Sequence, residues 1–186
     1  MSDKQKFPLV DAMKVACEIV DRLKPACERL CIAGSIRRQK PEVSDIEILF
    51  IPKLDTRPDG LFDSVAVNLA AEAINKDVES GYFAKRPSVT GSFSWGESNK
   101  LAIHTASGIP VDLFATDVAR WFVALTIRTG SKDTNLALTM GANKKNASLM
   151  AYGAGVKWRD GTVTQAASER HVFEMCGVPY REPKDR

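Results

Sequence analysis

The first part of the chain combines helical and extended patterns of apolar residues. Apolar side chains recur three and four positions apart over residues 9–23, which predicts an amphipathic helix. Short, mainly apolar runs predict strands at residues 30–33 and 45–51. We expect a loop over the turn-rich residues 52–60 and a second helix over residues 61–78.

The middle of the chain predicts strands, and the remainder predicts mainly helices. Runs rich in strand-forming residues favour strands at residues 82–86, 89–95, 100–104 and 111–115. Three hydroxyl residues stand where they can cap helices, and they are Thr116, Ser131 and Ser168. An Asp-Gly pair at residues 160–161 predicts a hairpin turn.

This order of elements predicts an α+β fold. We place a sheet domain at residues 1–118 and a small, mainly helical domain at residues 119–186. The second part holds 11 Lys and Arg against 6 Asp and Glu, a net charge of +5, while the first part has −2. A basic second part suits a polyanion such as nucleic acid. No apolar run approaches the roughly 18 residues of a membrane span, so we expect a soluble, cytoplasmic protein with no membrane partner.

An acidic pair interrupts the strand predicted at residues 45–51. Asp45 and Glu47 are two residues apart, so in a strand both side chains point to the same face. Asp112 stands in a similar apolar run. Carboxylates buried together are costly unless a cation joins them. Three of them on neighbouring strands form an oxygen-rich site suited to two Mg²⁺ ions, which can serve phosphoryl transfer.

The turn at Gly34 and Ser35 supplies features that suit an anion. Glycine allows close backbone approach, Ser35 adds a hydroxyl donor, and Arg37 and Arg38 offer charge for a triphosphate. Each feature alone is an ordinary turn, surface pair or strand face. Their combination between Gly34 and Glu47 favours a nucleotidyl-transfer site.

These residues resemble a known motif. The pattern G-S-x-R-R, followed by D-x-E beginning at Asp45, is similar to the nucleotidyltransferase motif of the family X DNA polymerases, the DNA polymerase beta family. The later 111-VDLF-114 resembles the family's third-carboxylate strand, and 129-TGSKDTN-135 resembles the start of its thumb. The tail 168-SERHVFEMCGVPYREPKDR-186 resembles its C-terminal segment. The likeness spans nearly the whole chain, as a nucleotidyltransferase palm followed by a thumb.

The resemblance implies roles for individual residues. Asp45, Glu47 and Asp112 would be the catalytic, metal-binding carboxylates, with Mg²⁺ as the cofactor and Mn²⁺ as a possible substitute. The residues implied to bind the incoming nucleotide are Gly34, Ser35, Arg38, Ser44, Thr129, Gly130 and Asn135. Basic residues of the thumb that we assign to DNA are Lys132, Lys144 and Lys145. Arg37 has two interpretations, a phosphate ligand or a structural ion-pair partner.

Three positions depart from the family pattern. Glu47 replaces the usual second Asp, and Ser44 replaces the usual Gly before the first. Ile127 and Arg128 stand where the family often has Tyr-Phe, an aromatic pair associated with excluding the ribose 2′-hydroxyl. We therefore expect weak discrimination between deoxynucleotides and ribonucleotides. The early position of Gly34 leaves no room for the family's lyase and helix-hairpin-helix regions, so we expect a minimal palm-thumb form of the kind carried by compact viral or phage genomes.

The sequence thus predicts a monomeric DNA-directed DNA polymerase. It would add deoxynucleoside triphosphates to a primer 3′-hydroxyl by two-metal chemistry, in short-gap filling during DNA repair. Two alternatives remain open. One is a template-independent nucleotidyltransferase acting on RNA, a small molecule or a protein, and the other is a non-catalytic module that binds nucleic acid.

Overall fold

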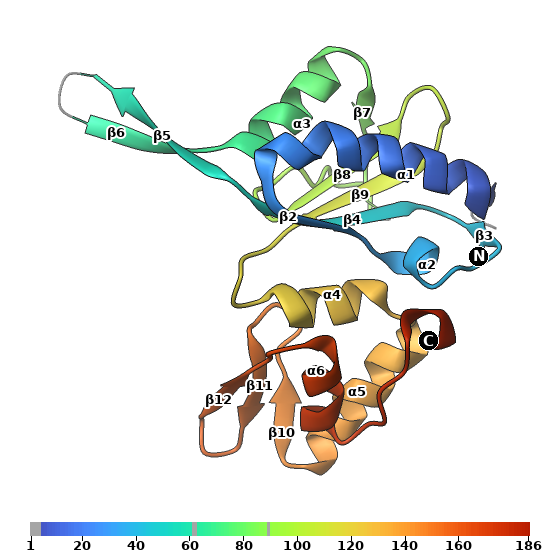
Figure 1. Ribbon diagram of the computed structural model, residues 1–186, viewed down its shortest axis with the longest axis vertical. Coiled ribbons are helices and arrows are strands. Elements are labelled where there is room, and N and C mark those ends of the chain that lie inside the picture. The colour runs from blue at the N-terminus through green and yellow to red at the C-terminus, as the bar shows by residue number, and fades with distance from the viewer. Residues whose placement is uncertain (1–4, 61–62, 89) are drawn as a thin grey trace.

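The computed structural model describes residues 5–60, 63–88 and 90–186, and these residues form two lobes (Figure 1). The first lobe is built on a five-stranded sheet with the order β2-β4-β9-β8-β7. Its strands are β2 (Cys27–Ile32), β4 (Ile46–Pro52), β7 (Phe83–Lys85), β8 (Asn99–His104) and β9 (Pro110–Ala115). β4 and β9 are parallel, and the other neighbours are antiparallel. This mixed sheet with its helices confirms the predicted α+β fold.

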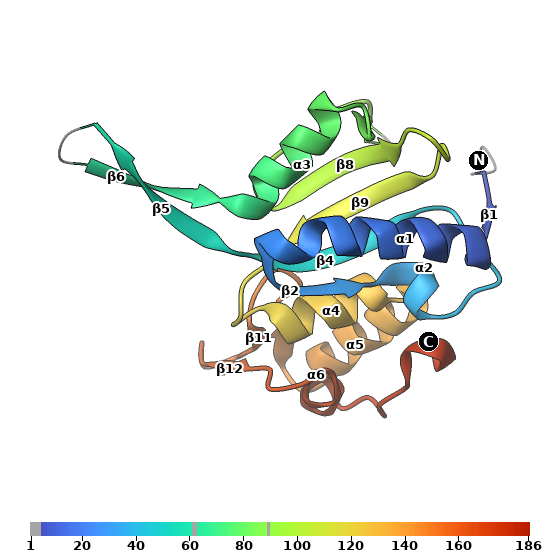
Figure 2. The same ribbon diagram turned by 45° about the horizontal axis from the view of Figure 1, so that its top comes forward.

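Two helices, α1 (Leu9–Leu23) and α3 (Leu69–Glu79), cover one face of the sheet (Figure 2). The helix predicted at residues 9–23 has the predicted bounds. Its buried residues are Ala12, Ala16, Ile19 and Leu23, which recur at the spacing of one helix face. They pack in the main core with Ile46 and Ile48 of β4.

The opposite face of the sheet is covered by α4 (Trp121–Thr129). Leu49 and Ile51 of β4 pack there with Trp121, while Ile46 and Ile48 point to the main core. β4 is therefore buried on both sides, which explains its nearly continuous apolar sequence. Because side chains alternate along a strand, Glu47 lies on the face that α4 covers.

A two-stranded ribbon projects from the first lobe, and its presence corrects two predictions. β5 (Leu54–Asp59) lies where we predicted a loop, and it pairs with β6 (Asp63–Asn68), where we predicted a helix (Figure 1). Residues 61 and 62, where the predicted helix begins, lie outside the described residues. The helix starts later because the Asn68 side chain accepts a hydrogen bond from the Ala71 backbone N–H at 2.9 Å and caps α3. The sequence pattern did not predict these two strands, because the ribbon is exposed and has no apolar face turned to the core.

The strand predicted at residues 89–95 is also wrong over its described part. Isolated bridges join Pro87 to Phe93 and Trp95 to Lys100, and a looped segment runs between β7 and β8. Val89 lies outside the described residues. A short pairing that we did not predict joins β1 (Phe7–Pro8) to β3 (Glu42–Val43) and ties the chain start to the loop before Asp45.

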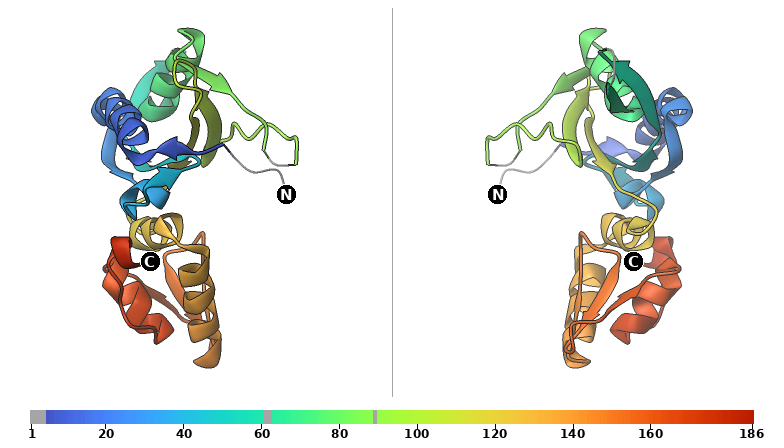
Figure 3. Two further views of the ribbon diagram at one scale, coloured as in Figure 1. Left: turned by 90° about the vertical axis from the view of Figure 1, so that its right-hand side faces the viewer. Right: turned by 90° about the vertical axis from the view of Figure 1, so that its left-hand side faces the viewer.

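The second lobe packs helices against a small sheet (Figure 3). Its helices are α4, α5 (Lys132–Lys144) and α6 (Glu169–Cys176), and its strands are β10 (Ala147–Leu149), β11 (Gly155–Trp158) and β12 (Val163–Gln165). The turn predicted at residues 160–161 joins β11 to β12. The caps predicted at Ser131 and Ser168 are confirmed by their hydrogen bonds to the backbone of α5 and α6.

The cap predicted at Thr116 is wrong. Its backbone N–H instead donates to the Phe50 carbonyl at 2.9 Å, which extends the strand pairing. α4 therefore begins only at Trp121. The division of the chain at residue 118 stays a prediction. None of the helices within the described residues has both the length and the apolar character needed to span a membrane.

Candidate active site

Three predicted carboxylates gather on the α4 face of the sheet. Glu47 of β4 is paired in parallel register with Asp112 of β9, and Asp45 immediately precedes β4. Burial raises the pKa of the Glu47 carboxyl to about 7, and repulsion by Asp45 and Asp112 adds to this increase. Arg128 and Arg38 act in the opposite direction. The three carboxylates are thus close enough to repel one another.

The predicted phosphate turn lies directly against this row. Gly34 begins the short helix α2 (Gly34–Arg37) with a φ of +60°. A Cβ atom at Gly34 would lie 1.9 Å from Glu47 Oε2, so only glycine leaves room for that carboxylate. The Ala33 N–H donates to the Glu47 carbonyl at 2.8 Å and fixes the approach. The structure therefore brings the turn and the acidic pair together.

Two predicted triphosphate ligands have buried polar atoms without a hydrogen-bond partner among the described residues. They are Ser35 Oγ and Arg38 Nε. Buried polar atoms are normally paired, so orphaned donors beside a glycine turn fit a site that binds an anion. Arg38 also donates through Nη1 to the Thr129 carbonyl. Burial lowers the pKa of the Arg38 guanidinium, while the charges of Glu47 and Asp45 favour its protonated form.

Arg128, which stands at one of the positions that depart from the family pattern, lies next to the carboxylate row. The Arg128 guanidinium sits 3.5 Å from the centre of the Phe114 ring. Phe114 is two residues beyond Asp112 in β9, so both side chains point to the same face. The Arg128 charge favours the ionised form of Glu47. Arg128 therefore partly compensates the negative charge of the row.

The carboxylates of Asp45, Glu47 and Asp112 supply oxygen atoms of the kind that bind a divalent cation. Among the described residues, no three His, Cys, Asp or Glu side chains are arranged as a ready metal site. The Asp112 carboxylate forms an ion pair with Arg86. The chemistry of the set still fits a hard cation, because it offers carboxylate oxygens from adjacent strands and a cation would relieve the repulsion that raises the Glu47 pKa.

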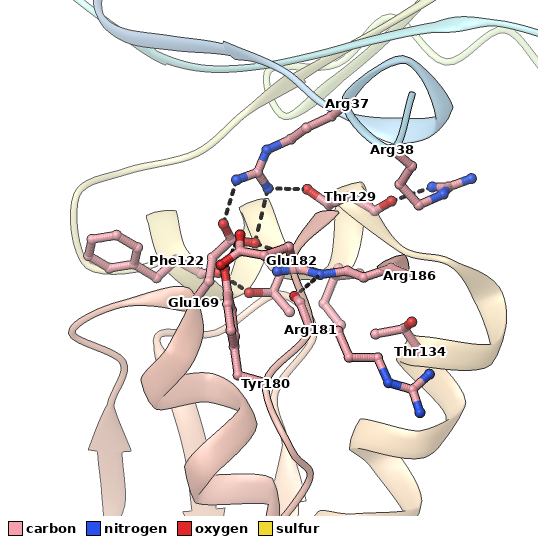
Figure 4. A network of polar contacts seen from close by, with 12 residues as sticks. Arg37, Arg38, Phe122, Thr129, Thr134, Glu169, Tyr180, Arg181, Glu182 and Arg186 are labelled. Atoms are coloured by element: carbon pink, nitrogen blue, oxygen red, sulfur yellow. Dashed lines mark hydrogen bonds and ion pairs between the residues drawn. The ribbon is translucent and has the colours of Figure 1, made fainter. Parts of the chain in front are cut away.

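A polar network joins the turn at Gly34 and the arginines after it to the second lobe (Figure 4). Arg37 forms two hydrogen bonds with the Glu169 carboxylate, at 3.0 and 2.5 Å, and a third with Thr129 Oγ1 at 2.5 Å. Arg186 donates to the same carboxylate at 2.9 Å. Of the two interpretations of Arg37, the structure shows the ion pair. Nothing in the local sequence around Glu169 or Arg186 indicated this network.

Three of the four remaining nucleotide-binding candidates lie around the junction of the two lobes. Thr129 is buried and accepts hydrogen bonds from Arg37 of α2 and from Arg38, the residue that follows this helix. A Cβ atom at Gly130 would lie 3.2 Å from Arg38 Nη1, and Asn135 Nδ2 donates to the Ile127 carbonyl at 2.9 Å. Ser44 lies apart from them, beside Asp45, where its hydroxyl accepts from Lys6 Nζ at 3.0 Å.

The three lysines assigned to DNA do not form one patch. Lys132 and Lys144 are exposed at opposite ends of α5, which are separated by about 18 Å at 1.5 Å per residue. The Lys145 ammonium donates to the carbonyls of Glu174 and Met175 at 3.0 and 3.2 Å. It thereby satisfies the end of α6, so Lys145 has a structural use that the sequence did not indicate.

The fold and the site define the class of the protein, a palm-thumb nucleotidyltransferase-like chain. Residues 124–186 match the family model described as the DNA polymerase beta thumb. The chain is also 26% identical over 172 residues to DNA polymerase lambda of Rattus norvegicus, a match that covers 84% of this chain and 28% of the relative's length. Both findings are likenesses to the family X DNA polymerases, in the thumb over residues 124–186 and over most of the chain to DNA polymerase lambda.

Proposed function

We propose that this chain is a DNA-directed DNA polymerase that extends a primer 3′-hydroxyl and fills short gaps in DNA repair. The observation that carries the proposal is the register of Glu47 with Asp112, with Asp45 beside them and the Gly34 turn packed against Glu47. Cation ligands and a phosphate-binding turn thus share one face of the sheet. The likeness to a DNA polymerase supports a DNA substrate over a small acceptor.

Asp45, Glu47 and Asp112 would hold Mg²⁺, or Mn²⁺ in its place. Bound Mg²⁺ supplies positive charge that stabilises the charge developing on the transferred phosphoryl group. The Gly34 backbone and Ser35 Oγ bind the triphosphate. Arg38 adds a fixed positive charge when its guanidinium turns from the Thr129 carbonyl toward the phosphates.

Primer extension with Mg²⁺ tests this proposal. Gapped, nicked, recessed and single-stranded substrates are each offered one deoxynucleoside triphosphate at a time, with Asp45→Asn as the inactive control. Incorporation of only the templated base, in the wild type alone, is the expected result. Untemplated addition would replace the proposal with a template-independent transferase. Binding without incorporation on every substrate would favour a non-catalytic module.

We also propose that the protein acts as a monomer in the cytoplasm. Light scattering of the purified chain at working concentration tests the first part, with a mass of 20.4 kDa expected for one chain. Localisation of a tagged chain in its own host tests the second part.

A further inference from the structure

A cavity of about 180 Å³ opens beside the carboxylate row. Phe7 and Pro110 give it apolar walls, while Ser44, Asp45 and Arg86 give it polar ones. At about 30 Å³ for each water molecule, the space equals about six waters. A space of this size suits a single sugar or base.

Two positively charged side chains, those of Lys6 and Arg86, border the cavity. Lys6 reaches Ser44 with its ammonium group, and Arg86 lines the cavity itself. The Arg86 backbone N–H donates to the Leu101 carbonyl at 3.0 Å, and Leu101 is the register partner of Asp112. This pairing sets Arg86 on the far side of β8 from β9, with its side chain reaching across to Asp112.

The pair between Arg86 and Asp112 is largely shielded from water. The Arg86 side chain is 20% exposed and that of Asp112 is 18% exposed. The Nε atom of Arg86 is buried and has no hydrogen-bond partner among the described residues, so the guanidinium has unused donor capacity. A phosphate oxygen would match both its charge and its donors.

We propose that Arg86 couples binding of the acceptor strand to binding of the divalent cation. The inference rests on the proposed function. The 3′-terminal nucleotide of the strand occupies the cavity, and its phosphate takes the Arg86 guanidinium away from Asp112. Asp112 is then released toward Asp45 and Glu47 as a cation ligand.

The coupling follows from shared partners. A divalent cation and Arg86 compete for the Asp112 carboxylate, while a strand phosphate and Asp112 compete for the Arg86 guanidinium. Each ligand removes the competitor of the other, so each strengthens the other's binding by the same factor. We expect a factor of about ten, within the range typical of coupled sites.

The test measures the Kd of Mn²⁺ by electron paramagnetic resonance of the free ion. The full chain is titrated alone and with a primer-template whose primer ends in a 2′,3′-dideoxynucleotide, without any nucleoside triphosphate. In the wild type the DNA should lower the Kd about tenfold. In Arg86→Gln the Kd without DNA should already be about tenfold lower, and DNA should not change it further. Unchanged Mn²⁺ affinity with full coupling in this variant overturns the proposal.

Arg57→Gln is the matched control, because Arg57 is an exposed arginine that pairs with Glu72 and Asp55 on the ribbon. Its coupling should equal that of the wild type. A second measurement needs no variant. A primer whose last linkage is a neutral methylphosphonate should bind without changing the Mn²⁺ Kd, and tenfold coupling with that primer contradicts the proposal.

Primer extension run in parallel separates this inference from the proposed function. If the wild type extends primers but shows no coupling, the function stands and the inference fails. If coupling is present without extension, the link between DNA binding and cation binding through Arg86 is supported, and the proposed polymerase activity fails.

Discussion

The Glu169 carboxylate of α6 pairs with both Arg37 of α2 and Arg186, and replacement of Glu169 by Gln should destabilise the fold. The Glu169 side chain is 11% exposed, Arg37 is 21% exposed and Arg186 is fully buried. Removing one partner of a buried ion pair typically costs about 3–5 kcal/mol. Glutamine keeps one acceptor, so we expect a loss of about 3 kcal/mol in the free energy of unfolding. For a chain of this size that lowers Tm by about 6–12 °C.

The dependence on pH identifies the cause of this loss. Burial alone would raise the Glu169 pKa, but the hydrogen bonds and charges of Arg37 and Arg186 outweigh it and lower the pKa. A carboxyl with a lowered folded-state pKa stabilises the protein above its unfolded pKa, near 4.5, and this contribution is lost as pH falls through the folded value. The difference between wild type and Glu169→Gln should therefore be largest at pH 7 and shrink steadily below about pH 4.

Urea unfolding at a series of pH values measures this difference. Glu72→Gln is the control, because Glu72 pairs with Arg57 on the exposed ribbon, where both side chains are more than a third exposed. A surface pair of this kind should cost less than about 1 kcal/mol. Equal losses in the two variants, or a loss in Glu169→Gln that does not change with pH, would refute the reasoning.

Three further predictions concern activity and binding. Asp45→Ala should abolish nucleotide incorporation, and it should raise the free energy of unfolding by on the order of 1 kcal/mol because Glu47 loses a repelling neighbour. Activity assays and urea unfolding measure the two effects. Full activity would exclude Asp45 as a ligand of the cation. Raising the salt concentration from about 50 to about 200 mM should weaken duplex DNA binding tenfold or more, measured by fluorescence anisotropy. Binding that does not depend on salt would exclude electrostatic contacts to the DNA backbone. The kcat/KM for a matched deoxynucleotide should exceed that for the ribonucleotide by only about tenfold to a few hundredfold. The reason is that Arg128 lies on Phe114 and the chain has no Tyr-Phe pair before Thr129. A preference of many thousandfold would show that other residues exclude the ribose 2′-hydroxyl.

Elements that bury a regular face could be predicted from the sequence. The helix at residues 9–23 places its apolar side chains toward one core, and the caps Ser131 and Ser168 act within four residues of themselves. The site at Asp45 and Glu47 could be predicted for a similar reason, because two carboxylates within one mainly apolar strand indicate a bound cation. These features depend on local pattern alone.

The features that were missed depend on contacts between distant segments. The β5–β6 ribbon buries no face, so its residues carry no periodic signal. Arg86 meets Asp112 only because β7, β8 and β9 align in one register. The network of Arg37, Glu169 and Arg186 spans more than 130 residues of sequence. Only the packed structure shows which of the chain's charged residues meet.

The parallel pairing of β4 with β9 has a consequence for how the protein folds. Ile46 is the partner of Val111, so this contact closes a long stretch of chain that must first build β5, β6, α3, β7 and β8. Closing such a distant contact is entropically costly, and it tends to limit the folding rate. The pairing also brings three carboxylates together, and Arg128 and Arg38 compensate their charge only in part. The register that places Glu47 beside Asp112 should thus be among the last features that a refolding molecule regains.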